Sequence, residues 1–343
     1  MSTFQQLCDQ AEAYADNVNL LIILAVKSAM SAVGLAGFIV VYKRQRLTNT
    51  FHCNARLLLR FHIAFVILSS MGILIPDGYN FIHYTVVRWL RNHKDCPVTP
   101  MSQYFTILRM LKLTGYDGST YTAAAWVLER VYATMFTHSY EKKCSALGWA
   151  LSCTATAAAL IGTAVRISLG DYSMPIPVMM ITGSSYKFNM TVQTVAACVE
   201  VFNVLILLIL LVINRRRLRK SAGIARSLTT KYQIRENVLA TSLILPLALL
   251  HCLLYFPAAI VMPLVTKQGL SPYERVILFA NSEWLVVYSL ALPLLLWWRN
   301  GVKKSHVESL VRNNLIGEKY KNDRKEGKVE TAKYFEMFNQ MLA

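Results

Sequence analysis

Seven long apolar stretches alternate with short polar segments along this chain of 343 residues. The hydrocarbon core of a bilayer takes roughly 20 mostly apolar residues per helical crossing. The stretches cover residues 18–42, 55–75, 102–136, 146–169, 191–213, 238–265 and 276–298. Arg109, Lys112 and Asp117 interrupt the third stretch, but no proline breaks it between residues 101 and 136. The pattern predicts an all-α membrane protein folded as a seven-transmembrane helix bundle.

Composition points away from a soluble protein. Charged residues make up 16% of the chain and apolar residues 55%, whereas about 25% of a soluble domain is charged. The net charge of +17 gathers in short basic segments beside the apolar stretches, where it faces anionic headgroups. We therefore expect the lipid bilayer as a partner, and no nucleic acid.

The placement of Lys and Arg predicts the orientation, because positive residues in short loops stay cytoplasmic. Alternate connecting segments carry six Lys and Arg on one side and twenty-three on the other. Residues 1–17 belong to the poorer side, which predicts an outside N-terminus and an inside C-terminus. The expected organisation is an extracellular arm (1–17), a transmembrane domain (18–298) and a basic cytoplasmic tail (299–343) that could form an amphipathic helix.

The seven cysteines lack metal-like spacing, and we expect neither a metal nor another cofactor. On the predicted topology only Cys8 and Cys96 face the oxidising side, where disulfides persist. We predict a disulfide between them, with two free thiols as the alternative. Asn189 opens the only N-glycosylation sequon and falls on an outer loop, so it is the candidate glycosylation site.

The third stretch ends in a charged pair, Glu129 and Arg130, within the segment "ERVYATMFTHSYEKK" (129–143). A charge at a membrane boundary is costly and is a functional candidate by default. The alternative is an arginine that reaches the lipid headgroups, with Glu129 beside it and without a functional role. Seven spans, an outside N-terminus and a Glu-Arg pair ending the third span resemble the plan of G-protein-coupled receptors.

A closer resemblance extends over nearly the whole chain. The segments "FHCNARLLL" (51–59), "ERVYATMFTHSYEKK" (129–143) and "SLTTKYQIRENVLATSLILPLALLH" (227–251), with residues 96–109, resemble nematode chemosensory receptors of the Sra superfamily. The most similar class is serpentine receptor class beta (Srb), with classes alpha, alpha-beta and epsilon left open. The sequence departs from rhodopsin-like receptors, because its last span reads "LALPLLLWW" (290–298) and has no NPxxY. Tyr104 stands where class beta would have a second cysteine.

The resemblance implies a chemosensory receptor in the plasma membrane of a sensory neuron. Such a receptor binds a small-molecule chemical ligand and activates a heterotrimeric G protein. We also expect Glu129 and Arg130 to form an activation switch together with Glu236, which lies across the gap in the "KYQIREN" segment (231–237) at the start of span six.

Helical geometry suggests where a ligand would bind. At about 100° per residue, the face of Arg130 continues toward the outer end through Trp126, Ser119, Tyr116, Lys112 and Arg109. We expect a pocket in the outer half of the bundle, with packing as the alternative role of its aromatic residues. The candidate pocket residues are Arg109, Lys112, Tyr116, Glu200, His251, Tyr255 and Trp284.

Three further carboxylates in the spans need partners. Glu200 has no candidate partner except Lys112 or Arg109, which favours contact with a ligand. The mixed charges of this lining favour a polar or anionic ligand. Lys27 and Glu283 lie at similar depths in the first and last spans, and we expect a structural ion pair between them. Asp117 is expected to face a neighbouring helix.

A ligand-gated channel or a transporter-like protein with seven spans is the alternative to a receptor. Transporters often carry paired broken spans in related halves, and the sequence has no such pair. An intramembrane hydrolase would need clustered ligands, and His62 and His251 have no His or Cys nearby at ligand spacing. We therefore do not expect an enzyme.

Overall fold

The computed structural model describes residues 3–43, 52–89, 103–136, 140, 146–169, 186–221, 228–265 and 270–298. Within these ranges the regular secondary structure is helical, without strands. The expected tail (299–343), Cys96 and the side chain of Arg109 lie outside the described part of the chain.

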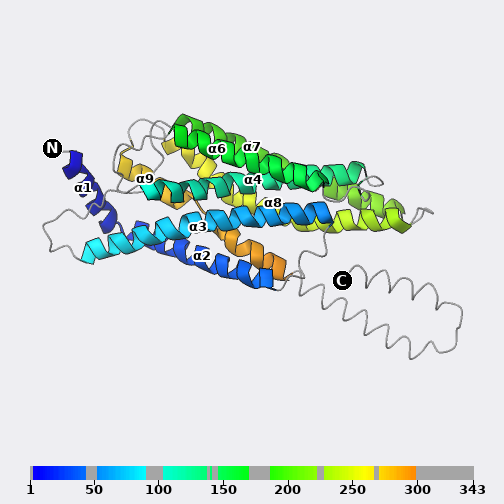
Figure 1. The fold of residues 1–343 in the computed structure, drawn as a ribbon, viewed down its shortest axis with the longest axis horizontal. Coiled ribbons are helices and arrows are strands. Elements are labelled where there is room, and N and C mark those ends of the chain that lie inside the picture. Colours follow the sequence, from blue (N-terminus) through cyan, green and yellow to red (C-terminus); the bar gives the residue numbers. More distant parts are fainter. Residues whose placement is uncertain are drawn as a thin grey trace, which may run out of the picture.

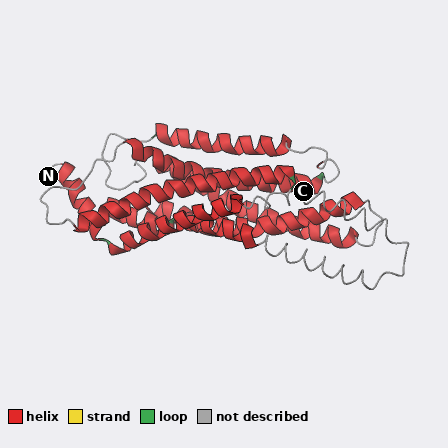
Figure 2. Ribbon diagram, turned by 60° about the horizontal axis from the view of Figure 1, so that its bottom comes forward, coloured by secondary structure: helices red, strands yellow, loops and turns green. Residues whose placement is uncertain are grey.

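The helices run side by side along the long axis of the molecule, with α1 at one end (Figure 1). A second view shows the same lengthwise packing (Figure 2). The described helices are α1 (Thr3–Asp16), α2 (Val18–Lys43), α3 (Cys53–Trp89), α4 (Gln103–Met135), α6 (Ala146–Ser168), α7 (Tyr186–Ser221), α8 (Leu228–Val265) and α9 (Pro272–Ser282).

All seven predicted spans are helical, but several helices extend further than the apolar stretches. Helix α3 continues through Pro76 to Trp89, and α8 begins ten residues before the predicted span. Apolar length records the part of a helix that needs lipid, whereas a helix can continue beyond the hydrocarbon wherever its backbone stays hydrogen-bonded. Hydropathy therefore located the crossings and missed the helix ends.

Six helices are long and apolar enough to cross a membrane by length and composition. Helix α4 is the seventh crossing, and its charged residues keep it outside that set. It packs against α3, α6, α7 and α8. Polar side chains in a membrane protein face the bundle interior because lipid cannot satisfy them, and the most polar span accordingly lies at the centre.

Glycines allow α3 and α4 to approach closely. A Cβ built at Gly72 of α3 would collide with the backbone of Lys112, and one built at Gly115 of α4 would collide with Ser69. Transmembrane helices commonly use small residues in this way, since close backbones gain van der Waals contact. The contacts also show that α3 and α4 are antiparallel.

Span seven is interrupted, contrary to the continuous stretch expected over 276–298. Helix α9 ends at Ser282, residues 283–285 are not helical, and the helix resumes at residue 286. Side chains bind two of the carbonyls released there: Lys27 donates to Ala280 (2.6 Å) and Trp284 donates to Asn281 (2.7 Å). Irregular backbone at membrane depth is tolerated where protein groups satisfy it, and these donors do so.

The N-terminal arm is a helix that packs on the bundle. Tyr14 of α1 is buried, stacks on Tyr273 with ring centroids 5.2 Å apart and lies 6.1 Å from the ring of Tyr84. Burial raises the pKa of Tyr14 to about 12, so its phenol stays neutral. Cys8 of this helix is disulfide-bonded; its expected partner, Cys96, lies outside the described residues. We call this the α1 end of the bundle.

The glycine contacts give the first prediction. Gly72→Ala should lower the free energy of unfolding by about 1 to 3 kcal/mol, because the added methyl meets backbone atoms that must move. Gly78→Ala on the same helix is the control, since its Cβ would lie 3.5 Å from the Ser28 hydroxyl, an ordinary contact. Thermal unfolding of the two purified variants measures the difference, and equal midpoints would contradict the prediction.

Candidate ligand site and activation switch

Four charged side chains gather near the α1 end: Lys27 of α2, Asp77 of α3, Lys112 of α4 and Glu283 in the break of span seven. We call them the four-charge cluster. Lys112 forms an ion pair with Glu283. The Lys27 ammonium donates to the carbonyl of Ala280 (2.6 Å) and lies 5.8 Å from the centre of the Trp284 ring. Lys112 lies 5.7 Å from the centre of the Tyr116 ring.

Asp77 is the member of this cluster that was absent from the predicted site residues. It interacts electrostatically with Lys112, Lys27 and Glu283. It also lies on the buried stripe of α3, between Ile73 and Asn80. The spacing of four and three residues on one helix face was a usable signal.

A histidine network crosses the middle of the bundle. Its six members are all buried: His62, His251, Ser119, Thr122, Tyr288 and Glu200. His62 contacts the Thr122 hydroxyl through Nδ1 (2.9 Å) and the Tyr288 hydroxyl through Nε2 (2.8 Å). His251 Nε2 lies 3.1 Å from the Ser119 hydroxyl. The network therefore joins α3, α4, α8 and the last helical segment.

Glu200 of α7 enters this network through His251. The Nδ1 atom of His251 lies 3.0 Å from Oε1 of Glu200. The two groups are not aligned as a hydrogen bond, and neither carboxylate oxygen of Glu200 has a hydrogen-bond partner among the described residues. The contact joins α7 and α8.

Asp117 faces a neighbouring helix, as expected, and Arg166 of α6 is its partner. The buried Arg166 guanidinium forms an ion pair with Asp117 and donates from Nε to Oδ1 of Asn189 (2.7 Å). It also lies 6.0 Å from the centre of the Phe188 ring. These contacts join α4, α6 and the start of α7 through a buried charge pair.

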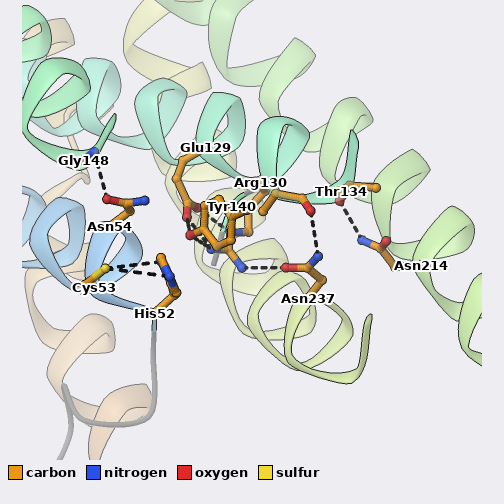
Figure 3. Close-up of polar contacts among 11 residues, drawn as sticks. His52, Cys53, Asn54, Glu129, Arg130, Thr134, Tyr140, Gly148, Asn214 and Asn237 are labelled. Carbon is orange, nitrogen blue, oxygen red and sulfur yellow. Dashed lines mark hydrogen bonds and ion pairs between the residues drawn. The ribbon is translucent and has the colours of Figure 1, made fainter. Parts of the chain in front are cut away.

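The opposite end of α4 holds the Arg130 cluster, which comprises Glu129, Arg130, Tyr140 and Asn237 (Figure 3). Arg130 binds Glu129 in a bidentate manner, with both N–O distances at 2.5 Å. It also donates to the Tyr140 hydroxyl (3.1 Å), and that hydroxyl donates to Glu129. The guanidinium is 1% exposed, so Arg130 points into protein rather than toward headgroups.

Helix α8 contributes Asn237 to this cluster. Arg130 Nη1 lies 3.4 Å from Oδ1 of Asn237, and the Asn237 amide donates to the Ala133 carbonyl (3.1 Å). Glu236 was expected at this position; it interacts electrostatically with Arg130, while the next residue makes the contact. One residue turns a helix by about 100°, which accounts for the difference.

A comparison with protein families identifies the chain. The model for the serpentine type 7TM GPCR receptor class ab chemoreceptors matches residues 5–343. The chain belongs to this family. It is thus a multi-pass membrane protein and a nematode chemosensory G-protein-coupled receptor, a class that is not enzymatic. The match does not single out class beta, and a search of curated proteins found no match.

The residues predicted to line one pocket of the receptor fall at two levels. Lys112, Tyr116 and Trp284 lie around the four-charge cluster. His251, Glu200 and Tyr255 belong to the deeper region, where the His251 and Tyr255 rings stack with centroids 6.2 Å apart. The predicted face of α4 is buried at Tyr116, Ser119, Trp126 and Arg130.

The expected Lys27–Glu283 ion pair is not formed. Glu283 pairs with Lys112 instead, and Lys27 binds the carbonyl of Ala280. The break in span seven explains the exchange, because it exposes a carbonyl to Lys27 and moves Glu283 off the regular helix. Depth along two neighbouring helices could not reveal this rearrangement.

Asn189 does not fit a glycosylation site. Its side chain is 4% exposed, and its amide oxygen accepts from Arg166. A glycan on the same amide group would have to occupy the packed bundle. A sequon is defined by three consecutive residues, whereas the burial of Asn189 depends on its contact with Arg166 of another helix.

This burial gives the second prediction. Treatment of receptor from expressing cells with peptide N-glycosidase should leave its electrophoretic mobility unchanged. Thr191→Ala, which removes the sequon and keeps Asn189, should likewise migrate as the original protein does. A glycosylated marker protein in the same sample controls for enzyme activity, and a faster band after treatment would refute the prediction.

Proposed function

We propose that the receptor binds a small chemical between the helices at the α1 end and activates a heterotrimeric G protein at the Arg130 end. The α1 end would face the outside of a sensory neuron's plasma membrane. The six-to-twenty-three distribution of Lys and Arg supports this orientation. The predicted tail, which carries ten of these residues, would then be cytoplasmic.

The observation that carries the proposal is the closed Arg130 cluster between α4 and α8. A buried guanidinium is tolerated because Glu129 neutralises it and Tyr140 adds a further contact. Charge-assisted, bidentate contacts of this kind are among the stronger polar interactions in proteins. The Glu129–Arg130 pair is therefore the stronger contact of the cluster, and the 3.4 Å contact with Asn237 is the weaker one.

The energy needed to open the cluster suits a switch. Coupling between a ligand site and a distant site typically amounts to about 1 to 3 kcal/mol. A hydrogen bond to a charged group contributes about 1.5 to 3 kcal/mol, and the 3.4 Å contact between Arg130 and Asn237 is a long one. Loss of this contact and of the Asn237–Ala133 bond would remove the two hydrogen bonds that Asn237 of α8 makes with α4.

Helix α8 provides the connection between the two ends. It meets α4 at His251, opposite Ser119, and again at Asn237, opposite Arg130. The two positions are fourteen residues apart, which corresponds to about 21 Å along the helix. A ligand that changes the packing around the histidine network would bias the same pair of helices that closes the Arg130 cluster.

The third prediction separates this switch from a structural role of the same residues. Asn237→Ala should raise nucleotide exchange by the G protein in the absence of ligand, because it removes the α8 contacts and keeps the Glu129–Arg130 pair. Asn214→Ala is the matched control: Asn214 is a buried asparagine of α7 that donates to the Thr134 hydroxyl of α4 (3.0 Å). Exchange is measured in membranes at equal surface expression.

Two further variants bear on the same mechanism. Glu129→Gln should also raise ligand-free exchange, since it weakens the neutralisation of Arg130. Arg130→Ala should reach the surface and fail to activate. If Asn237→Ala and Asn214→Ala show the same basal exchange, or if Arg130→Ala activates normally, the proposed switch is wrong.

A further inference from the structure

The four-charge cluster points to a chemical class of ligand. We infer that the receptor recognises a small zwitterion, a molecule with one ammonium and one carboxylate group, at Lys27, Asp77, Lys112 and Glu283. This inference rests on the proposed function, in which a small chemical binds at the α1 end. It names what that chemical must carry.

Three of the four charged side chains are partly exposed, whereas Lys27 is 3% exposed. Asp77 is only half-buried, although Ile73 and Asn80 on the same stripe of α3 are 3% and 2% exposed. The paired side chains of Lys112 and Glu283 are 19% and 22% exposed. Groups on buried faces keep such exposure only where the neighbouring helices leave space between them.

Helix direction turns two of these side chains toward each other. Helices α3 and α4 are antiparallel, and a helical side chain leans toward the N-terminus of its own helix. Asp77 therefore leans down along α3 toward Gly72, which packs on Lys112. Lys112 leans up along α4 toward the level of Asp77. Their electrostatic interaction agrees with this convergence.

The bundle leaves part of this polar surface unsatisfied. Asp77 makes no hydrogen bond or ion pair with the described residues, and the hydrogen bond of Lys27 goes to a neutral carbonyl. One turn from Asp77 and from Lys112, the buried Asn80 Oδ1 and Tyr116 hydroxyl also have no hydrogen-bond partner in the described structure. Unpaired charges and orphan polar atoms within a membrane bundle mark a site that a ligand completes.

The charge balance selects the ligand. Among the described residues, two lysines and two carboxylates give the cluster no net charge, so an anion or a cation alone would leave one sign in excess. The expectation of a polar or anionic ligand rested on Arg109, Lys112 and Glu200 and did not include Asp77. A zwitterion matches both signs, with its ammonium on Asp77 and its carboxylate on Lys27. The rings of Trp284 and Tyr116 beside the lysines would pack against its carbon skeleton.

The test uses the purified full-length receptor in lipid nanodiscs. The probes are the neutral L-amino acids and the straight-chain ω-amino acids of three to six carbons. Each probe is paired with the amine that lacks its carboxylate and with the acid that lacks its ammonium. At least one zwitterion should raise the thermal unfolding midpoint in a saturable manner, and its two analogues should bind about tenfold more weakly or worse, because each loses a charge-assisted contact.

Variants then locate the binding. Asp77→Asn and Lys27→Met should each weaken binding of the active zwitterion by about tenfold or more, whereas Glu12→Gln on the exposed face of α1 should leave it unchanged. The probe series on the original receptor decides the matter even if a variant does not fold. No binding by any zwitterion, equal binding of an amine or acid analogue, or unchanged affinity in both cluster variants overturns the inference.

The outcome is separable from that of the proposed function. If a zwitterion binds at the cluster and stimulates no nucleotide exchange, the ligand class stands and the proposed signalling role fails. If Asn237→Ala raises exchange and no zwitterion binds, the switch stands and the ligand class is wrong.

Discussion

The fold depends on one constraint: a span that carries several charges can cross a bilayer only if the protein itself satisfies them. Helix α4 contains Lys112, Asp117, Glu129 and Arg130, and each has a charged partner inside the bundle. Burying a charge without a partner would cost far more than folding can recover. The neighbouring elements therefore lie where they can supply partners for the charges of α4, and the polar sites lie along the length of this helix.

The same constraint explains the broken last span. Four side chains donate hydrogen bonds to carbonyls near the end of α9. Asn281, Ser282 and Trp284 lie within or beside the break, and the fourth donor is Lys27 of α2. A break of this kind frees backbone carbonyls and turns Glu283 toward α4, so structure and site arise from one feature. Neither Gly nor Pro marks residues 281–285, which is why the sequence pattern predicted an uninterrupted helix.

Sequence patterns could predict what depends on a single helix. Apolar length located the seven crossings, and the helical period identified the buried face of α4 from Tyr116 to Arg130. Which side chains pair across two helices depends on how the helices are rotated relative to one another. The sequence pattern does not contain this rotation. Glu283 therefore pairs with Lys112 rather than Lys27, and the patterns predicted neither Arg166 as the partner of Asp117 nor Asn237 as a contact of Arg130 beside Glu236.

Helix α8 is built so that its two contacts with α4 need not move together. Pro246 lies between Asn237 and His251 within the continuous helix. A proline lacks the N–H that would bond the carbonyl four residues earlier, and its ring crowds that carbonyl, so a helix bends more readily there. The segment bearing Asn237 can thus swing away from Arg130 while His251 stays against Ser119. Such a hinge would convert a small repacking beside the histidine network into a larger displacement at the Arg130 end, because displacement grows with distance from the bend.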